Sequence, residues 1–354
     1  MRRPFPSLLL LLACLSLAGC LRPDGAAPAP EVVLSDGYGP ECHACNLVKL
    51  PDGSLAAAWF SGAKEGADDV VIRFTRQESA GGRWLKPVTV ADHHGTPCWN
   101  PVLFVGGDGH LTLFYKVAKR IPDWEGWFRT SSDGGRSWSA ATRLPTGFLG
   151  PIRCHALARP DGSTLFGSST ESGAGTKPWR AHFERCTRQT DFADPAGWSR
   201  TTPADGTPAL NAIQPSIVDL GAGRLAAFVR TREGVVGQTE SSDDGRSWSA
   251  LRPLEPRQAN PNSGLEAVAL PDGRVALVLN PGKDRLRLDV VTRAADGKTW
   301  ELLLPVDRTA KGEVSYPSAL VDVVDGQAYL RVCYTRNRRE IVLRSFPLPP
   351  GPTR

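Results

Sequence analysis

The sequence contains no long hydrophobic segment beyond its first 20 residues. No later run reaches about 20 apolar residues, the length that a membrane-spanning helix needs. An excess of one charge is also missing, because 42 Lys and Arg residues are interspersed with 37 Asp and Glu residues and the net charge is only +5. Without a basic stripe, nucleic acid is not expected as a partner.

Metal-binding and phosphate-binding patterns are absent as well. No zinc spacing or phosphate-loop motif appears, so we expect no cofactor and no metal. Cys42-x-x-Cys45 has no second pair like it and falls in a predicted strand, which favours a structural role over a metal site. Six cysteines follow Cys20, and their disulfide pairing cannot be read from the sequence: Cys42, Cys45, Cys98, Cys154, Cys186 and Cys333.

Helical periodicity is the last notable absence. Apolar residues alternate with polar ones instead, and 36 Gly and 30 Pro residues supply many turns. This combination predicts many short strands and an all-β fold.

The N-terminus has the features of an export signal. Arg2 and Arg3 precede the apolar run that begins at Leu8–Leu12, and this run ends in Leu17-Ala18-Gly19-Cys20. These four residues resemble the lipobox of bacterial lipoproteins, which implies cleavage before Cys20 and lipid attachment to its thiol. The alternative is an ordinary secreted protein with a chance cysteine.

A lipid on Cys20 would hold the protein at a membrane of the bacterial cell envelope. Leu21 follows the cysteine where an Asp would indicate inner-membrane retention, so the outer membrane is the expected location. We therefore divide the chain into a signal peptide (1–19), a lipid anchor with its linker (20–36) and one folded domain (37–350), and we expect a monomer.

One motif occurs twice. Ser131–Trp138 reads SSDGGRSW and Ser241–Trp248 reads SSDDGRSW, and both fit Ser-x-Asp-x-Gly-x-x-Trp. Ser and Asp side chains bond backbone amides in tight turns, Gly adopts a left-handed backbone, and the Trp can fold back as an apolar plug. We interpret both copies as structural turns on the outer rim of the fold.

A simpler turn signal recurs six times, with about 53 residues per unit. Each turn joins two strand-like runs, and the turns centre on Gly53, Gly109, Gly162, Gly223, Gly273 and Gly326. Two hairpins per unit give four strands, so the sequence predicts a six-bladed β-propeller of four-stranded antiparallel blades.

Closure of the ring requires one more strand. After Gly326 only Ala328–Tyr334 and Glu340–Phe346 read as strands, which leaves the last blade one strand short. We predict that Glu31–Ser35 completes this blade; the alternative is that these residues are further linker.

These motifs resemble the bacterial sialidases and the wider sialidase-like hydrolases over roughly Cys42 to Leu348. The likeness is closest to the lipoprotein branch called predicted neuraminidases. It implies an exo-glycosidase that hydrolyses terminal sialic acid or a related acidic sugar from a glycan. Sialidases use a Tyr nucleophile, because a neutral phenol is not repelled by an anionic sugar.

The resemblance assigns roles to particular residues. Tyr316, in Tyr316-Pro317-Ser318-Ala319-Leu320, matches the nucleophile, and Asp68 or Asp69 matches the acid/base carboxylate. Arg230 and Arg285 match two of the three arginines that hold the sugar carboxylate.

Two positions depart from the family pattern. The place of the first arginine reads Glu41-Cys42-His43-Ala44, and Gln214 stands where a glutamate normally activates the Tyr. An amide cannot accept the phenolic proton. Glu266 and Glu313 are the candidates to replace this base, and His43 and Arg153 are the candidates to replace the arginine.

The first residues of each inner strand are expected to surround the axis of a propeller. Asn100 and Gln214 join the substrate-binding candidates on this ground, and further pocket candidates are Asn280, Asn337, Arg338, Glu171, Arg180 and His182. Trp124 and Trp127 either stack on a sugar ring or are exposed hairpin aromatics.

Two other functions stay open. Gln214 and the missing arginine fit a glycan-binding lipoprotein that has lost catalysis. A polysaccharide lyase acting on uronate-containing glycans would use a Tyr with a His or Arg, and its unsaturated product would absorb in the ultraviolet.

Overall fold

The computed structural model describes residues 30–171, 178–187, 191–293 and 298–349. Within these ranges the regular elements are strands β1 to β24 and two short 3₁₀ helices, η1 (Ile121–Asp123) and η2 (Pro195–Gly197). No helix in the described part of the chain is long and apolar enough to cross a membrane. Cys20, the predicted lipidation site, lies outside the described residues.

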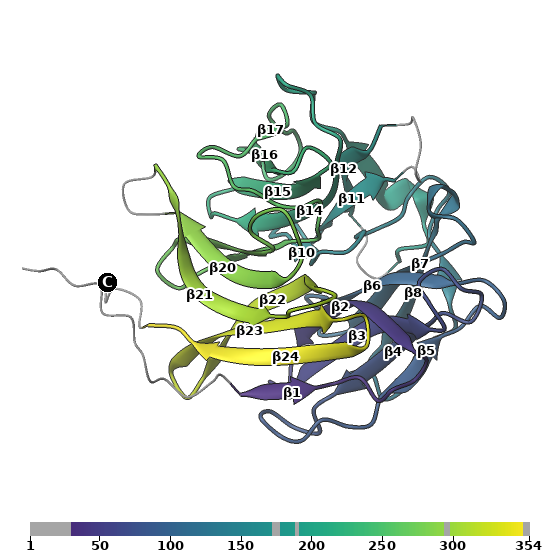
Figure 1. Cartoon of the computed structure of the whole chain (residues 1–354). Helices are drawn as coiled ribbons and strands as arrows, with labels where there is room; N and C mark the ends of the chain where they lie inside the picture. Colours follow the sequence, from purple (N-terminus) through teal and green to yellow (C-terminus); the bar gives the residue numbers. More distant parts are fainter. Residues whose placement is uncertain (1–29, 172–177, 188–190, 294–297, 350–354) are drawn as a thin grey trace, which may run out of the picture.

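The strands form six four-stranded antiparallel sheets arranged as the blades of a propeller (Figure 1). The prediction of six blades is therefore confirmed. The first three blades are β2 (Glu41–Lys49), β3 (Leu55–Gly62), β4 (Val71–Arg76) and β5 (Val88–Ala91); β6 (Cys98–Val105), β7 (Leu111–Val117), β8 (Glu125–Ser131) and β9 (Thr142–Arg143); and β10 (Leu157–Ala158), β11 (Thr164–Thr170), β12 (Arg180–Cys186) and β13 (Trp198–Thr201). The last three are β14 (Ala212–Asp219), β15 (Leu225–Thr231), β16 (Val236–Ser241) and β17 (Arg252–Pro253); β18 (Glu266–Ala269), β19 (Val275–Leu279), β20 (Arg287–Arg293) and β21 (Trp300–Arg308); and β22 (Val314–Val324), β23 (Gln327–Arg336), β24 (Glu340–Pro347) and β1 (Glu31–Val33).

The N-terminal strand closes the ring. β1 pairs antiparallel with β24, with Glu31 opposite Arg344 and Val33 opposite Val342. In Figure 1 the purple β1 lies along the yellow β24. The prediction that Glu31–Ser35 supplies the missing strand is thus confirmed, because its first three residues pair as expected.

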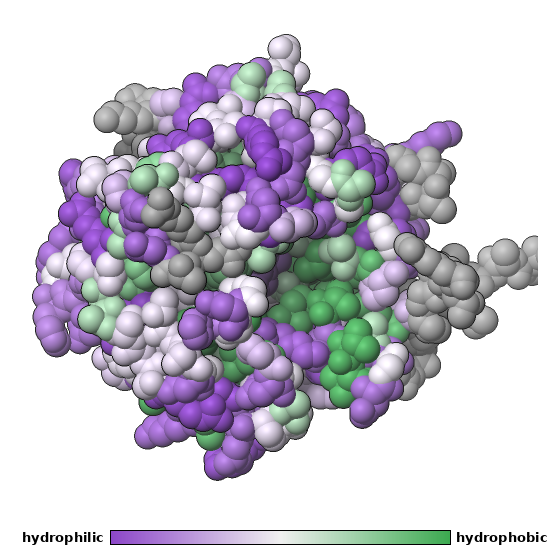
Figure 2. All heavy atoms as spheres, turned by 180° about the vertical axis from the view of Figure 1, so that it is seen from behind, coloured by the Kyte–Doolittle hydropathy of each residue, from purple (hydrophilic) through white to green (hydrophobic). Residues whose placement is uncertain are grey.

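The core consists of apolar side chains packed between neighbouring blades. The two repeated Trp residues contribute to it: Trp138 meets Phe74 of blade one edge-on at 5.3 Å between ring centroids, and Trp248 stacks on Phe183 of blade three at 3.6 Å. Each Trp therefore pins the outer turn of its own blade to the preceding blade. Seen from behind, the surface is largely hydrophilic, and the hydrophobic residues visible there gather around a hollow (Figure 2).

The repeated turn is held by its own side chains. Asp243 accepts hydrogen bonds from the backbone and hydroxyl of Ser247 at 2.9 and 2.6 Å, and Gly245 N donates to Ser241 Oγ at 2.8 Å. The bonds from Ser247 lower the pKa of Asp243 to about 2, although the residue is only half-buried. Ser131, Asp133 and Ser137 make the same contacts in blade two, which supports the structural interpretation of the motif.

Trp248→Ala is expected to lower the free energy of unfolding by about 3 kcal/mol, the scale for removing a large buried aromatic. Trp248 is 9% exposed, and the substitution removes the stacking of its ring on Phe183. Chemical denaturation measures the effect. Trp300→Ala is the matched control, because Trp300 is only half-buried and a smaller loss is expected. Equal losses in the two variants would contradict the plug role.

The cysteines of the CxxC pair are unsuited to bind metal. Cys42 and Cys45 lie in β2, and both are buried free thiols. Cys98, Cys154 and Cys333, in other parts of the fold, are buried free thiols as well. Burial raises the pKa of Cys42 to about 12, so its thiol stays protonated, whereas metals bind thiolates. The described residues contain no cluster of three or more His, Cys, Asp or Glu side chains that could hold a metal ion.

Candidate functional site

Four inner strands carry the same bulge at the end that faces the site. The pairing register of β2, β6, β14 and β22 shifts by an extra residue, and a residue inside each shift has a positive φ. In three of them this residue precedes a proline: Asn100 (φ 38°), Gln214 (φ 57°) and Tyr316 (φ 54°). A bulge redirects a side chain, and strained backbone of this kind is typical of functional sites.

The three redirected side chains meet in one cavity of about 320 Å³. Four arginines and two glutamates give it an excess of positive charge, and three tryptophans supply flat apolar surfaces. The lining residues are Glu65, Trp99, Asn100, Ile121, Trp124, Glu171, Trp179, Gln214, Arg230, Arg232, Arg285, Tyr316 and Arg338. A cavity of this size with a few convergent polar groups is the usual form of a small-ligand site.

The Tyr316 phenol is surrounded by guanidinium groups. Arg230 Nη1 donates to Tyr316 Oη at 2.6 Å, and Arg230 Nε donates to Asn262 Oδ1 at 2.6 Å. The guanidinium carbon of Arg285 lies 5.6 Å from the centre of the Tyr316 ring. Two residues that the sequence assigned separately to nucleophile and carboxylate binding, Tyr316 and Arg230, are therefore in direct contact.

A single carboxylate holds two of the cavity arginines. Glu313 pairs with Arg285 Nη1 at 2.9 Å and with Arg338 Nε at 2.7 Å, and Arg338 also contacts Glu65. Glu313 was a candidate base, but both of its oxygens face guanidinium groups, so it positions Arg285 and Arg338. Arg338, which comes from the turn between β23 and β24, supplies the third guanidinium beside Arg230 and Arg285.

His43 and Arg153 were expected to replace the missing arginine, but neither lines the cavity. His43 packs against Tyr316 with 4.1 Å between ring centroids, and neither ring nitrogen has a hydrogen-bond partner within the described chain. Burial, followed by the charges of nearby arginines led by Arg338, lowers the pKa of His43 well below its ordinary value, so the ring is neutral. Arg153 is 1% exposed and donates to Pro317 O at 2.7 Å, which supports the backbone next to Tyr316.

The other carboxylates predicted to take part in catalysis also lie away from the cavity wall. Glu266 is 1% exposed and accepts a hydrogen bond from Ser216 Oγ at 2.6 Å. Asp68 is exposed and pairs with Lys119 at 2.5 Å, and Asp69 accepts the backbone N–H of Ala63 at 3.0 Å. Among the acidic residues of the loop that holds Asp68 and Asp69, Glu65 is the one that lines the cavity.

Glu171 is the carboxylate that accompanies Gln214. Gln214 Nε2 donates to Glu171 Oε1 at 3.3 Å, and Ser169 Oγ donates to the same oxygen at 3.3 Å. Burial raises the pKa of Glu171, while the charges of Arg230 and Lys116 oppose the increase. A carboxyl group with a raised pKa can exchange a proton at a pH nearer neutrality than an ordinary glutamate can.

Glu171→Gln is expected to gain stability relative to the wild type as the pH rises. Because the folded pKa of Glu171 lies above its ordinary value of 4.5, the unfolded chain ionises first, and the wild type loses stability between those two pKa values. The uncharged variant does not. Melting temperatures at pH 4 and pH 8 test this, with the exposed Glu78→Gln as the control. A difference between Glu171→Gln and wild type that is the same at both pH values would contradict it.

Sequence reasoning missed several members of the lining, among them Glu65, Ile121, Trp179 and Arg232. Arg232 had a detectable signal, because Arg230-Thr231-Arg232 places two arginines on one side of an extended chain. The guanidinium carbon of Arg232 lies 4.2 Å from the centre of the Trp179 ring, and that of Arg230 lies 5.3 Å from it. Nothing local marked Trp179, which precedes β12 and reaches the cavity only in the folded ring.

Comparison with known proteins relates the chain to a family. The model of the BNR repeat-like domain matches residues 53–330. Among curated protein sequences, none matches the chain.

Solved structures share the fold at low sequence identity. A protein of unknown function from Dyadobacter fermentans has a TM-score of 0.69 and 16% identity, with 91% of this chain and 99% of that chain covered. The NanB sialidase from Streptococcus pneumoniae has a TM-score of 0.67 and 12% identity, with coverage of 90% and 70%. The intramolecular trans-sialidase from Ruminococcus gnavus has a TM-score of 0.66 and 14% identity, with coverage of 90% and 97%.

The family match covers most of the chain, and the solved structures share its six-bladed architecture. The chain therefore belongs to the BNR repeat-like domain family.

Proposed function

We propose that the protein hydrolyses a terminal acidic sugar, sialic acid or a related one, from glycans. The observation that carries this proposal is the Tyr316 phenol, which lies in contact with Arg230 in a cavity that holds four arginines. An anionic sugar would be attracted to this charge, and the tryptophans of the lining would pack on the apolar faces of its ring.

Arg230, Arg285 and Arg338 are the proposed binders of the sugar carboxylate. A planar guanidinium can donate two parallel hydrogen bonds to the two oxygens of a carboxylate. Glu313 already fixes the orientation of Arg285 and Arg338, so less conformational freedom is lost on binding.

Tyr316 is the proposed nucleophile. Its oxygen would form a bond to the anomeric carbon as the glycosidic C–O bond breaks, and water would then release the sugar in a second step. The hydrogen bond from Arg230 stabilises the negative charge that develops on the phenol oxygen when the proton leaves.

Two proton transfers need carboxylates. Gln214 cannot accept the phenolic proton, and we assign this role to Glu171, its hydrogen-bonded neighbour in the cavity. The leaving oxygen needs a proton donor, and Asp68 or Asp69 keeps this role in the proposal because Glu65, on the same loop, reaches the cavity.

The test is incubation with glycans that end in sialic acid or in a uronic acid, followed by mass spectrometry of the released sugars. We expect a free acidic monosaccharide and a glycan shortened by one residue. Intact glycans after prolonged incubation across such a panel would contradict the proposal.

A second candidate is a glycan-binding protein without turnover. The specific observation in its favour is Gln214, an amide at the position where the family pattern has a carboxylate. The same panel separates the two functions, because this candidate predicts saturable binding of an acidic glycan without release of a sugar.

A lyase is the third candidate, and the neutral His43 ring against Tyr316 favours it. A lyase would remove the proton beside a uronate carboxylate and leave an unsaturated sugar that absorbs in the ultraviolet. The absorbance of the reaction mixture distinguishes this product from that of a hydrolase.

The proposed location is the bacterial outer membrane, with a lipid on Cys20 as anchor. Mass spectrometry of the N-terminal peptide from native membranes tests this, and an unmodified Cys20 in the mature protein would contradict it.

A further inference from the structure

The nucleophilic side chains that the proposed function leaves unused include a group of three thiols. Cys42, Cys45 and Cys333 belong to one apolar cluster, with Leu47 and Leu343 among its other members. The exposed fractions of the three cysteines are 3%, 0% and 0%. Cys42 and Cys45 come from β2 of blade one, whereas Cys333 comes from β23 of blade six. Because β2 packs against β23, the cluster lies at the junction where the first and last blades close the ring.

The bulge in β2 brings both of its cysteines to this junction. Residues 42 and 45 are separated by an odd number of positions, and such residues face opposite sides of a regular strand. The pairing of β2 with β3 shifts between His43 and Asn46, and Ala44 within the shift has a φ of 54°. The extra residue turns Cys45 to the same side as Cys42, so both side chains enter the cluster with Cys333.

Of the two cysteines in β2, Cys45 is the closer partner of Cys333. Burial raises the pKa of the Cys333 thiol well above its ordinary value, and a side-chain hydrogen bond with Cys45 is the next cause, ahead of the charge of Cys42. Cys42 has a hydrogen bond with the side chain of Ser35 instead. Three described cysteines lie in other parts of the fold: Cys98, Cys154 and Cys186.

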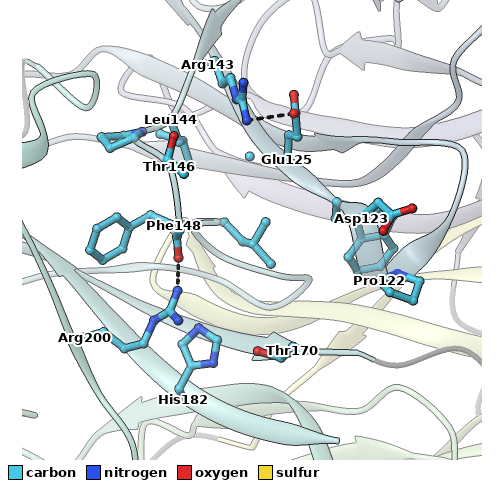
Figure 3. Close-up of a pocket in the computed structure, with 15 residues that line it drawn as sticks. Pro122, Asp123, Glu125, Arg143, Leu144, Thr146, Phe148, Thr170, His182 and Arg200 are labelled. Carbon is cyan, nitrogen blue, oxygen red and sulfur yellow. Dashed lines mark hydrogen bonds and ion pairs between the residues drawn. The ribbon is translucent and has the colours of Figure 1, made fainter. Parts of the chain in front are cut away.

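The folded protein shields these thiols from reagents. Neither the central cavity nor a second cavity of about 350 Å³, shown in Figure 3, has a cysteine among its lining residues. Cys45 and Cys333 are fully buried, so an oxidant reaches them only before the ring closes. An exported chain folds in an oxidising compartment, where structural disulfides form and persist.

We propose that Cys45 and Cys333 form a disulfide that joins blade one to blade six. The oxidant is a protein or small-molecule disulfide of the cell envelope. One cysteine attacks this disulfide, which forms a mixed disulfide and releases one thiol; the other cysteine attacks the mixed disulfide, which forms the Cys45–Cys333 bond and releases the second thiol. Two protein thiols are oxidised, and the two sulfurs of the reduced oxidant take up their protons. The inference depends on export of the chain but not on the proposed hydrolysis.

The bond would enclose almost the whole propeller in one covalent loop. A crosslink between distant residues removes conformational freedom from the unfolded chain, and the effect grows with the length of the loop. The strand pairing that closes the ring is short by comparison, because β1 contributes three residues. Cys45 Sγ also lies 3.7 Å from Tyr316 O, so the crosslink would fix β2 beside the strained backbone of Tyr316.

The first test is disulfide mapping of the full chain, isolated from the envelope of a bacterial host. Free thiols are blocked with N-ethylmaleimide in denaturant, and the unreduced protein is digested with trypsin. We expect mass spectrometry to find the Cys333 peptide linked to the peptide that holds Cys42 and Cys45. Fragment ions should place the link on Cys45 and the maleimide on Cys42. Cys333 blocked by maleimide in the wild type, or linked to Cys42, would overturn the proposal.

The second test measures the effect of the bond on stability. A reducing phosphine is expected to lower the melting temperature of the wild type by at least about 5 °C. Cys98→Ala, which removes a buried thiol of another cluster, should show the same fall. Cys333→Ala should melt at the same temperature with and without the phosphine. A wild-type melting temperature that the phosphine leaves unchanged, or an equal fall in Cys333→Ala, would contradict the crosslink.

The outcomes are independent of the proposed function. Neither test requires a substrate, so a protein that releases no sugar from any glycan can still contain the Cys45–Cys333 bond. Conversely, hydrolysis of an acidic glycan by a protein in which Cys333 is blocked by maleimide would support the proposed function and overturn the disulfide.

Discussion

Tyr316→Phe is expected to reduce kcat on a susceptible acidic glycan by at least about a thousandfold, which corresponds to roughly 4 kcal/mol of transition-state stabilisation. The substitution removes only the phenol oxygen, the atom proposed to bond to the anomeric carbon. The ring keeps its packing against His43 and its place over the Arg153 side chain, so fold and substrate binding should persist. Steady-state kinetics with the glycan identified by the screen measures the loss.

The control for this variant is Tyr329→Phe. Tyr329 is a partly buried tyrosine on β23 outside the cavity. Removal of its phenol oxygen should leave kcat unchanged. Binding of the acidic sugar by Tyr316→Phe should remain within a few-fold of wild type. Turnover in Tyr316→Phe equal to that of the control would remove Tyr316 from the chemistry and leave the cavity as a binding site.

Arg230→Lys is expected to lower kcat/KM about a hundredfold, or about 2.7 kcal/mol. Lysine keeps the positive charge but not the planar fork, so it cannot hold Tyr316 Oη and Asn262 Oδ1 while it binds a carboxylate. Competition by the acidic sugar and by an analogue whose carboxylate is replaced with an alcohol measures the carboxylate contribution. Arg230→Lys should weaken binding of the acid and leave binding of the alcohol nearly the same.

Arg224→Lys provides the matched comparison on the same blade. Arg224 is exposed at the turn between β14 and β15, where the charge of the side chain matters and the shape of its head group does not. The kinetics of Arg224→Lys should therefore equal those of the wild type. If Arg230→Lys weakened binding of acid and alcohol equally, Arg230 would support the cavity wall without recognising the carboxylate.

The number of blades could be predicted because each repeat contains a turn that its own residues specify. Gly53 and Gly109 mark sharp local turns, both with a φ of about 80°, and such turns depend on residues that are neighbours in the chain. The Trp of the repeated motif was also readable, since a turn that folds an apolar ring inward is encoded within eight residues.

The site was only partly predictable. Tyr316, Arg230, Arg285, Gln214 and Asn100 were identified, and all five line the central cavity. Five other predicted residues lie outside its lining: His43, Arg153, Glu266, Asp68 and Asp69. The position of a residue in the repeat predicts that it lies at the inner end of a blade. It does not predict whether the side chain reaches the central cavity or packs against a neighbouring residue.

The sequence by itself determined the repeat, the six blades and the strand that closes the ring, because turns, alternation and a missing strand are properties of contiguous residues. Only the tertiary structure decided that Arg338 joins Arg230 and Arg285, that Glu313 holds two of these arginines, and that Glu171 lies beside Gln214. These partners come from different blades, or from the two chain segments that flank one hairpin. They meet only because the folded ring brings separate strand ends together around one axis.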